Sequence, residues 1–291
     1  MTGILILDKP ADWTSHDAIG KLRGVFKQKR IGHGGTLDPM ATGILPIFLG
    51  RATRAVSMCE TMAKEYLAEI RLGVVTDTQD ITGKILSENH ADIGQSEFAD
   101  TLAFFTGSQA QLPPMYSAIK IGGKKLYELA RKGIEVERPP RDITIYSIDI
   151  IAKTEAGYLF RVVCSKGTYI RTLCHDIGAR LGCGGTLSSL RRTRVGAFSI
   201  DDAVTMDEVL DAASRGDPTS YLRPVDSLFS NYPSLVVTGG DEDRCRNGSE
   251  CRLAQANDGR YRVYNAQNEF LLIGMVESGI LHTEKSFFEV Q

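Results

Sequence analysis

Hydrophobic and polar positions along the chain predict short strands mixed with helices. The apolar run at 3–10 is typical of a short buried strand, which Pro10 closes. Alternating positions predict a second strand at 64–72, and the segments 141–152 and 158–164 predict two adjacent strands around a turn. The predicted helices cover residues 18–29, 51–63, 97–105 and 126–132, and another begins at residues 169–171. This mixture indicates an α+β fold.

The C-terminal part of the chain has a different character. Residues 200–213 form an acidic stretch with helical spacing, and residues 230–233 are typical of a linker. Short strand-like runs separated by turn signals follow this linker. We therefore expect a large domain at 1–230 and a small β-rich domain at 231–291.

A glycine-rich polar loop lies at 31–50 and leads into an apolar run. Its glycines let the backbone take positive φ and let a ligand approach closely, while Pro39 sets the direction of exit just after Asp38. The loop lacks the Lys-Ser/Thr pair of a P-loop and the spacing of a G-x-G-x-x-G fingerprint. An acid in such a loop is most often a cap or an Asx turn. Asp38 is nevertheless the reactive group that this loop offers.

Charge is unevenly distributed along the chain. The formal net charge of −2 and the sequence pI of about 6.2, taken alone, argue against a nucleic-acid partner. Between residues 114 and 196, however, 15 Lys and Arg stand against 7 Asp and Glu, whereas residues 197–243 hold 2 against 10. A basic middle beside an acidic neighbour predicts a polyanion site on one face.

Composition predicts a cytoplasmic globular protein. No apolar run approaches the roughly 20 residues that span a bilayer, and an acid interrupts the apolar N-terminus, so we expect no membrane segment and no signal peptide. The six cysteines show no C-x-x-C spacing, and the five histidines do not fall at metal-ligand spacings near them, which predicts reduced thiols and no metal. Cys245 and Cys251 can approach each other across a turn, but we expect no stable disulfide between them in the cytoplasm.

Five segments together resemble the TruB family of tRNA pseudouridine synthases. The loop segment GHGGTLDPMATGILPI is similar to the family's catalytic motif, which implies that Asp38 is the catalytic aspartate and that His33 belongs to the surrounding RNA-binding surface. The segment KEYLAEIRLGVVTDTQDITG resembles the second motif, in which a tyrosine stacks on the target base. That role falls to Tyr66, although tyrosines in strands most often serve simple packing.

Three further segments extend the resemblance along the chain as far as residue 198. PPMYSAIKIGGKKLYELARKGIEVERPPR matches an inserted RNA-binding arm, placed at about 119–150, where basic and aromatic residues suit phosphates and stacked bases. CSKGTYIRTLCHDIGARLG places Arg171 as the partner of Asp38, since a guanidinium fork matches a carboxylate. GGTLSSLRRTRVGAF places Leu190 at the pocket wall, although Leu190 is equally suited to the core, and directs Arg191, Arg192 and Arg194 towards RNA.

The resemblance assigns a role to each of these residues. Asp38, Arg171 and Tyr66 would be catalytic, with Arg171 keeping the pKa of Asp38 low. The residues expected to bind RNA or substrate are His33, Tyr169, Leu190, Lys9, Lys120, Lys124 and Lys125. The family fold is a mixed, mainly antiparallel central sheet flanked by helices, followed by a small β-rich PUA-like domain.

The implied activity is isomerisation of uridine to pseudouridine at position 55 in the T arm of tRNA. The reaction flips the target base out of its stack, cleaves the glycosidic bond and rejoins the ribose to ring carbon 5, and it requires no cofactor. We expect a monomer. Two alternatives stay open at this point: a tRNA-folding chaperone without essential chemistry, and a guide-dependent synthase that works within a ribonucleoprotein.

Overall fold

The computed structural model describes residues 1–253 and 255–288, so residues 254 and 289–291 of the predicted tail domain lie outside the described residues. The described part contains a ten-stranded mixed sheet with the order β14-β1-β3-β12-β4-β11-β10-β7, in which β2 pairs with β3 and β13 with β12. Only the pairs β1–β14 and β3–β12 of this sheet are parallel. Its strands are β1 (Gly3–Lys9), β2 (Ile31–His33), β3 (Thr42–Leu49), β4 (Lys64–Leu72), β7 (Gly107–Gln111), β10 (Arg141–Lys153), β11 (Gly157–Cys164), β12 (Gly185–Val195), β13 (Phe198–Ser199) and β14 (Val204–Thr205).

Strand β4 shows how the sequence pattern becomes sheet structure. Its alternate residues Lys64, Tyr66, Ala68 and Ile70 are buried, while the residues between them are not. The strand pairs with β12 on one side and with β11 on the other, so it lies inside the sheet. Its observed bounds, like those of β1, β10 and β11, confirm the predicted strands to within one or two residues.

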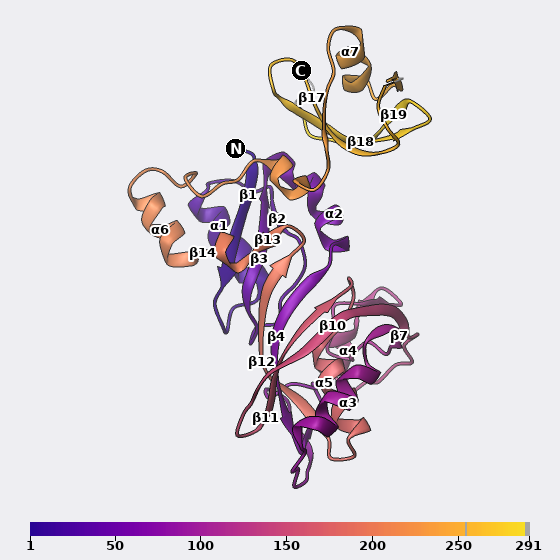
Figure 1. Ribbon diagram of the computed structural model, residues 1–291. Coiled ribbons are helices and arrows are strands. Elements are labelled where there is room, and N and C mark those ends of the chain that lie inside the picture. The colour runs from indigo at the N-terminus through magenta and orange to yellow at the C-terminus, as the bar shows by residue number, and fades with distance from the viewer. Residues whose placement is uncertain (254, 289–291) are drawn as a thin grey trace.

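Helices flank this sheet at both ends (Figure 1). Helix α1 (Ser15–Val25) begins with a capping box between Thr14 and Asp17 and ends before the predicted limit, since Lys27 takes a positive φ of 49°. Helices α3 (Gln95–Phe104) and α5 (Ile170–Arg180) lie together at the far end of the sheet (Figure 1), where α5 packs on β12 and α3 on β10.

Two predicted helices differ from the structure. Residues 51–63 form a 3₁₀ helix, η1 (Gly50–Ala55), followed by the short α2 (Val56–Thr61), whose last carbonyls accept hydrogen bonds from the buried Lys64 ammonium. The acidic stretch at 200–213 becomes η2 (Ile200–Asp202), the short strand β14 and only then helix α6 (Met206–Ser214). The helix starts late because β14 pairs with β1 and Thr205 caps the first turn.

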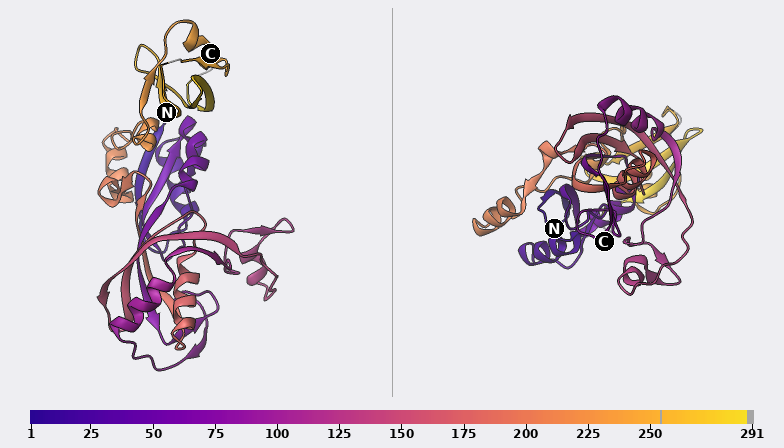
Figure 2. Two further views of the ribbon diagram at one scale, coloured as in Figure 1. Left: turned by 45° about the vertical axis from the view of Figure 1, so that its right-hand side comes forward. Right: turned by 90° about the horizontal axis from the view of Figure 1, so that it is seen from below.

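The basic arm projects from one edge of the sheet (Figure 2, left). The chain leaves the sheet at Gln111, the last residue of β7, and returns at its pairing partner Arg141, the first residue of β10. The segment between them carries β8 (Lys120–Ile121), β9 (Lys124–Lys125) and α4 (Leu126–Ala130). Residues 141–150, predicted to lie in the arm, therefore belong to the central sheet.

The C-terminal part is β-rich, as predicted, and it packs on the ten-stranded part of the molecule near the N-terminus (Figure 1). Within the described residues, its five-stranded sheet contains β15 (Ser234–Val236), β16 (Cys251–Arg252), β17 (Gly259–Tyr264), β18 (Phe270–Glu277) and β19 (Ile280–Ser286), with α7 (Gly240–Arg246) packed beside it and η3 (Val225–Phe229) preceding it. Ile273 and Phe287 of this part share one hydrophobic cluster with Ile4, Phe48 and Phe229. The two parts are thus joined by a common core as well as by the chain.

None of the described helices has the length and the apolar character that crossing a membrane requires.

Candidate active site

The loop between β2 and β3 holds Asp38 in a fixed turn. Main-chain bonds from Gly34 to the Pro46 carbonyl and from Ala41 to the Asp38 carbonyl close the loop. The buried Ser15 hydroxyl donates to the Leu37 carbonyl and accepts from the Leu37 amide, at 3.1 and 2.9 Å. These contacts hold the backbone beside Asp38 from both directions, so the aspartate is presented by a rigid segment.

Arg171, the second residue of α5, lies against Asp38. Its Nε is 2.9 Å from Asp38 Oδ2, and its Nη2 donates to Asp38 Oδ1 at 3.4 Å. The guanidinium also donates to the carbonyls of Thr78 at 3.0 Å and Tyr116 at 2.7 Å. The Asp38 side chain is 35% exposed and that of Arg171 only 6%, so solvent reaches the carboxylate but hardly the guanidinium. The structure thus brings together the two residues that the sequence predicted as a pair.

Asp80 is a second carboxylate at this site that the sequence reasoning missed. It lies in the turn between β5 (Val74–Thr76) and β6 (Ile85–Glu88), is 5% exposed, and places Oδ2 3.5 Å from Arg171 Nη1. Its Oδ1 accepts hydrogen bonds from the Thr78 hydroxyl and from the amide and hydroxyl of Thr82. In the sequence Asp80 is one of two acids in a polar turn, and its only distinguishing feature is its place in the second family motif.

The electrostatics of Asp38 differ from the prediction. Burial raises the pKa of Asp38, the Arg171 guanidinium opposes this effect, and the Asp80 carboxylate adds to it. The net direction is upward. The expectation that Arg171 keeps this pKa low is therefore wrong, because desolvation and a second carboxylate outweigh the ion pair. The carboxylate of Asp38 is consequently a better base and proton acceptor than an ordinary aspartate.

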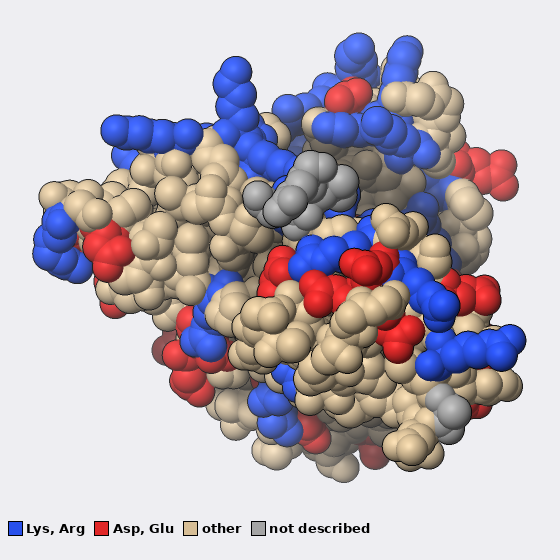
Figure 3. Space-filling model, turned by 90° about the horizontal axis from the view of Figure 1, so that it is seen from above, with Lys and Arg blue, Asp and Glu red and all other residues tan. Residues whose placement is uncertain are grey.

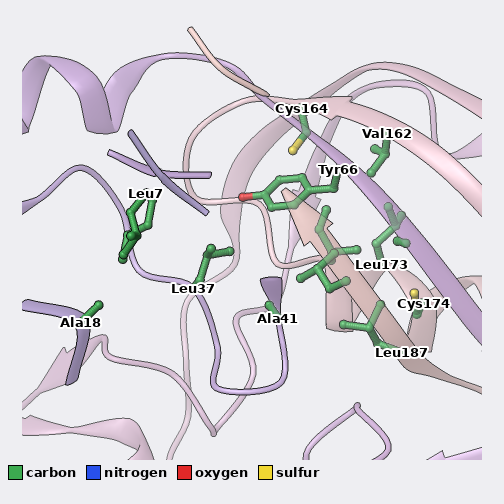
Figure 4. Close-up of a cluster of buried hydrophobic side chains, with 14 of the residues drawn as sticks. Leu7, Ala18, Leu37, Ala41, Tyr66, Val162, Cys164, Leu173, Cys174 and Leu187 are labelled. Carbon is green, nitrogen blue, oxygen red and sulfur yellow. The ribbon is translucent and has the colours of Figure 1, made fainter. Parts of the chain in front are cut away.

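Tyr66 belongs to the hydrophobic cluster that also contains Leu37, the residue before Asp38. Figure 4 shows its ring beside Cys164, with the hydroxyl directed towards the loop that carries Leu37. Tyr66 is 9% exposed and Leu190 8% exposed, and both belong to the main hydrophobic core. Burial raises the pKa of Tyr66, which keeps its hydroxyl protonated. Each residue has a small accessible surface and is otherwise packed in the core.

Lys9 was expected to bind RNA, but its position in the structure excludes this role. It is fully buried, and its ammonium donates to the carbonyls of Pro10 and Trp13, both at 2.7 Å, and of Pro39 at 3.2 Å. Burial lowers the pKa of Lys9 to about 8, although the Asp38 carboxylate favours its charged form. Lys9 therefore fixes the backbone directly after Asp38 from inside the protein.

Arg192 likewise turns inward instead of towards RNA. It is 1% exposed, and its guanidinium donates to the carbonyls of Ile44 at 2.7 Å and Gly35 at 3.1 Å, which ties the aspartate loop to β3. Arg191 forms an ion pair of 2.6 Å with Asp8. Of the three arginines expected to face RNA, only Arg194 is exposed, and it forms no ion pair within the part of the chain that the structure describes. The strand pairing of β12 with β3 decides this outcome.

The remaining predicted RNA-binding residues fall into two groups. His33, on β2, and Tyr169, directly before α5, are half-buried near the aspartate loop and near Arg171, respectively. Burial lowers the pKa of His33. Lys120, Lys124 and Lys125 lie on the arm, where Lys125 donates to the Tyr127 hydroxyl at 3.3 Å.

The surface carries its positive charge in clusters. Seen from above, Lys and Arg side chains project along the upper edge of the molecule, whereas Asp and Glu are interleaved with Lys and Arg over the middle of the view (Figure 3). On the arm, the ammonium of Lys125 and the guanidinium of Arg131 lie 5.4 and 5.5 Å from the centre of the Tyr127 ring. A ring flanked by two cations combines stacking capacity with phosphate affinity.

Comparison with known proteins identifies the family. Residues 23–170 match the model of the TruB family pseudouridylate synthase N-terminal domain, and residues 171–230 match that of the tRNA pseudouridylate synthase B C-terminal domain. The chain belongs to the TruB family. The resemblance drawn from the five motifs is thereby confirmed.

Curated TruB relatives match nearly the whole chain. A tRNA pseudouridine synthase B from Clostridium kluyveri is 44% identical over 281 residues, which cover 94% of this chain and 96% of the relative. A tRNA pseudouridine synthase B from Dehalococcoides mccartyi is 42% identical over 290 residues, with 99% of this chain and 97% of the relative covered. The expected class of enzyme, an isomerase, is confirmed.

Solved structures confirm the TruB fold. A chain in the crystal structure of a Cbf5-Nop10-Gar1 complex is 25% identical, with a TM-score of 0.75 over 98% of this chain and 85% of that one. A chain in the structure of an H/ACA RNP bound to a substrate RNA containing 2'-deoxyuridine is 24% identical, with a TM-score of 0.74 over 99% and 85% of the two chains. The similarity to this second chain is evidence for a shared fold only.

Proposed function

We propose that this protein isomerises uridine to pseudouridine at position 55 in the T arm of tRNA, with Asp38 as the catalytic group. The observation that carries the proposal is the Asp38–Arg171 pair, in which a fixed, solvent-reachable carboxylate meets a buried guanidinium. The names of the curated relatives support tRNA as the substrate. Family membership and the five motifs support the position in the T arm.

The isomerisation balances within the nucleotide and uses no outside reagent. The bond between N1 of uracil and the ribose C1′ breaks, the uracil turns, and C5 bonds to C1′. N1 gains a proton and C5 loses one. Asp38 provides the reactive carboxylate for these steps, and Arg171 holds that carboxylate in place. Its raised pKa suits a group that exchanges protons with the base.

Binding requires that the target base leave its stack. Unstacking costs a few kcal/mol, and a ring placed to stack on the extruded base offsets part of that cost. We assign this role to Tyr66, with Leu190, which pairs with Ala68 on the strand that carries Tyr66, as an apolar wall. The cationic arm then supplies phosphate contacts through Lys120, Lys124 and Lys125.

The two alternative functions are less well supported. The relatives at 40–44% identity are named tRNA pseudouridine synthase B, which favours direct action on tRNA over a guide-dependent reaction. The intact Asp38–Arg171 pair and the buried Asp80 favour chemistry over a purely chaperone role. We also propose that the enzyme acts as a monomer in the cytoplasm, and light scattering of the purified protein tests its oligomeric state.

The decisive experiment uses the purified protein alone with an unmodified tRNA transcript. Pseudouridine is then mapped along the RNA, and a matched transcript with cytidine at position 55 serves as the control. We expect modification at position 55 of the first transcript and none in the second. Modification only after addition of a guide RNA, or only at other positions, would contradict the proposal.

A further inference from the structure

Gln111 occupies the point where the arm leaves the central sheet. It is the last residue of β7, only 4% exposed, and pairs across the sheet with Arg141, where the arm returns. Neither its sequence context nor the proposed chemistry assigns a role to this side chain. Its buried carboxamide nevertheless reaches out of the sheet to Tyr169, which lies 58 residues further along the chain, directly before α5.

The carboxamide binds both main-chain polar groups of Tyr169. The Tyr169 amide donates to Gln111 Oε1 at 2.8 Å, and Gln111 Nε2 donates to the Tyr169 carbonyl at 3.0 Å. Tyr169 is the N-cap of α5, and its own side chain does not cap the helix. The start of a helix has amide groups without partners inside the helix. Gln111 therefore fixes a helix start that has no side-chain cap of its own.

Arg171 follows this fixed point by two residues. Its guanidinium must reach Asp38, Asp80 and the carbonyls of Thr78 and Tyr116 at the same time. Such a multiple contact tolerates little movement of the backbone that carries it, and a displacement of about 1 Å can reduce a catalytic rate about a hundredfold. The orientation of the first turn of α5 thus decides whether Arg171 meets Asp38.

We propose that Gln111 is a positioning residue for Arg171, which holds the first turn of α5 so that the guanidinium stays against Asp38. Because Gln111 is also the root of the arm, the same contact links the arm to the catalytic pair. The inference rests on the proposed function in one respect, since it treats Asp38 and Arg171 as the catalytic pair. The competing explanation is that Gln111 only satisfies buried polar groups and contributes to stability.

A neighbouring glutamine provides a matched control. Gln109 lies two residues earlier on the same strand and face, and its carboxamide donates to the Phe105 carbonyl at the end of α3 instead of to α5. We compare Gln111→Met with Gln109→Met, which removes the same carboxamide group from the same strand. Gln111→Glu provides a second variant of similar size, for use if the methionine variant folds poorly. It retains an acceptor for the Tyr169 amide.

The first measurement is single-turnover pseudouridine formation beside tRNA affinity. For Gln111→Met we expect a rate about tenfold to a hundredfold lower, with affinity within about threefold of wild type. Gln111→Glu should also lose rate, because its carboxylate cannot donate to the Tyr169 carbonyl, and Gln109→Met should stay within about twofold in rate. Equal losses in Gln111→Met and Gln109→Met, or an unchanged rate in a folded Gln111→Met protein, would overturn the proposal.

The pH profile separates positioning from stability. Arg171 favours ionised Asp38, whereas burial and Asp80 oppose ionisation, and the buried Lys9 ammonium also favours the ionised form. Displacing the guanidinium should therefore move the acidic limb of the rate profile to higher pH in Gln111→Met. A purely structural role would lower the rate or the melting temperature without moving that limb.

A final readout needs no turnover. The NMR signal of the Arg171 Nε–H, identified by its loss in Arg171→Lys, reports the guanidinium in the RNA-free protein. We expect this signal to shift in Gln111→Met and to remain in place in Gln109→Met. An unmoved signal would refute the positioning role even if the protein proved to act on a different RNA. If the Arg171 signal moves in Gln111→Met but the wild-type protein forms no pseudouridine at position 55, only the proposed function is refuted.

Discussion

Replacing Asp38 by asparagine gives the sharpest test of the proposed chemistry. The change keeps the shape of the side chain and its place between Leu37 and Pro39 but removes the negative charge. Removal of a reactive carboxylate should slow pseudouridine formation by at least about 10⁴-fold, which corresponds to about 5.4 kcal/mol of transition-state stabilisation. The tRNA affinity should stay within about tenfold, or 1.4 kcal/mol, because phosphate contacts on the arm are unchanged.

The stability of Asp38→Asn follows from two opposing terms. Loss of the contact to Arg171 removes a charged hydrogen bond, which typically contributes about 1.5–3 kcal/mol. The raised pKa of Asp38 means, however, that the folded state holds the ionised form unfavourably at neutral pH. Asp80 and two backbone carbonyls still bind the guanidinium after the substitution. We therefore expect a change in unfolding free energy within about 1 kcal/mol at pH 7.

The sign of the pH dependence is fixed by the same raised pKa. Below the ordinary carboxyl pKa both the folded and unfolded protein carry a neutral Asp38, so this group contributes no difference. As the pH rises through the unfolded and then the folded pKa, wild type should lose stability relative to Asp38→Asn. Melting curves between about pH 4 and 7 test this trend, with Asp77→Asn as the exposed control in the nearby turn.

Two results would refute this reasoning about Asp38. A folded Asp38→Asn protein that modifies tRNA at nearly the wild-type rate would remove Asp38 from the chemistry. Because deamidation of asparagine regenerates aspartate, Asp38→Ala should be measured in parallel. A melting temperature that falls steeply in both variants at pH 7 would show that the Asp38–Arg171 pair is chiefly a structural contact.

Three further predictions concern groups around the site. Asp80→Asn should lower the single-turnover rate about tenfold without changing tRNA affinity, since it loosens the guanidinium; equal loss of affinity would contradict this. Replacing Lys124 and Lys125 by Glu should weaken tRNA binding and flatten its salt dependence, whereas an unchanged slope of log affinity against log salt would place the RNA elsewhere. A fragment of residues 1–230 should melt at a lower temperature than the full chain, because the buried Phe229 loses its aromatic neighbours; a fragment of equal stability in calorimetry would show that the tail packs only weakly.

The sequence by itself determined most of the strands and the central loop. Alternation at 64–72 specified β4, because a strand buried on one face repeats every two residues. The helix at 51–63 and the helix start at 200 were less well predicted. In the second case Val204 and Thr205 pair with β1, and no local pattern shows that a strand from the far end of the chain is available for pairing.

The aspartate motif and the arginine of α5 were also readable from the sequence, since each lies in a motif of defined spacing. Asp80 and Gln111 were not, because they act through partners 91 and 58 residues away, and only the folded chain brings them within hydrogen-bond distance. The sequence showed Lys9 and Arg192 as cations suited to RNA. The tertiary structure turned both inward, because strand pairing placed them beside backbone carbonyls that a buried ammonium or guanidinium can satisfy. Charge is a property of a residue type, whereas burial is decided by the neighbours that the fold supplies.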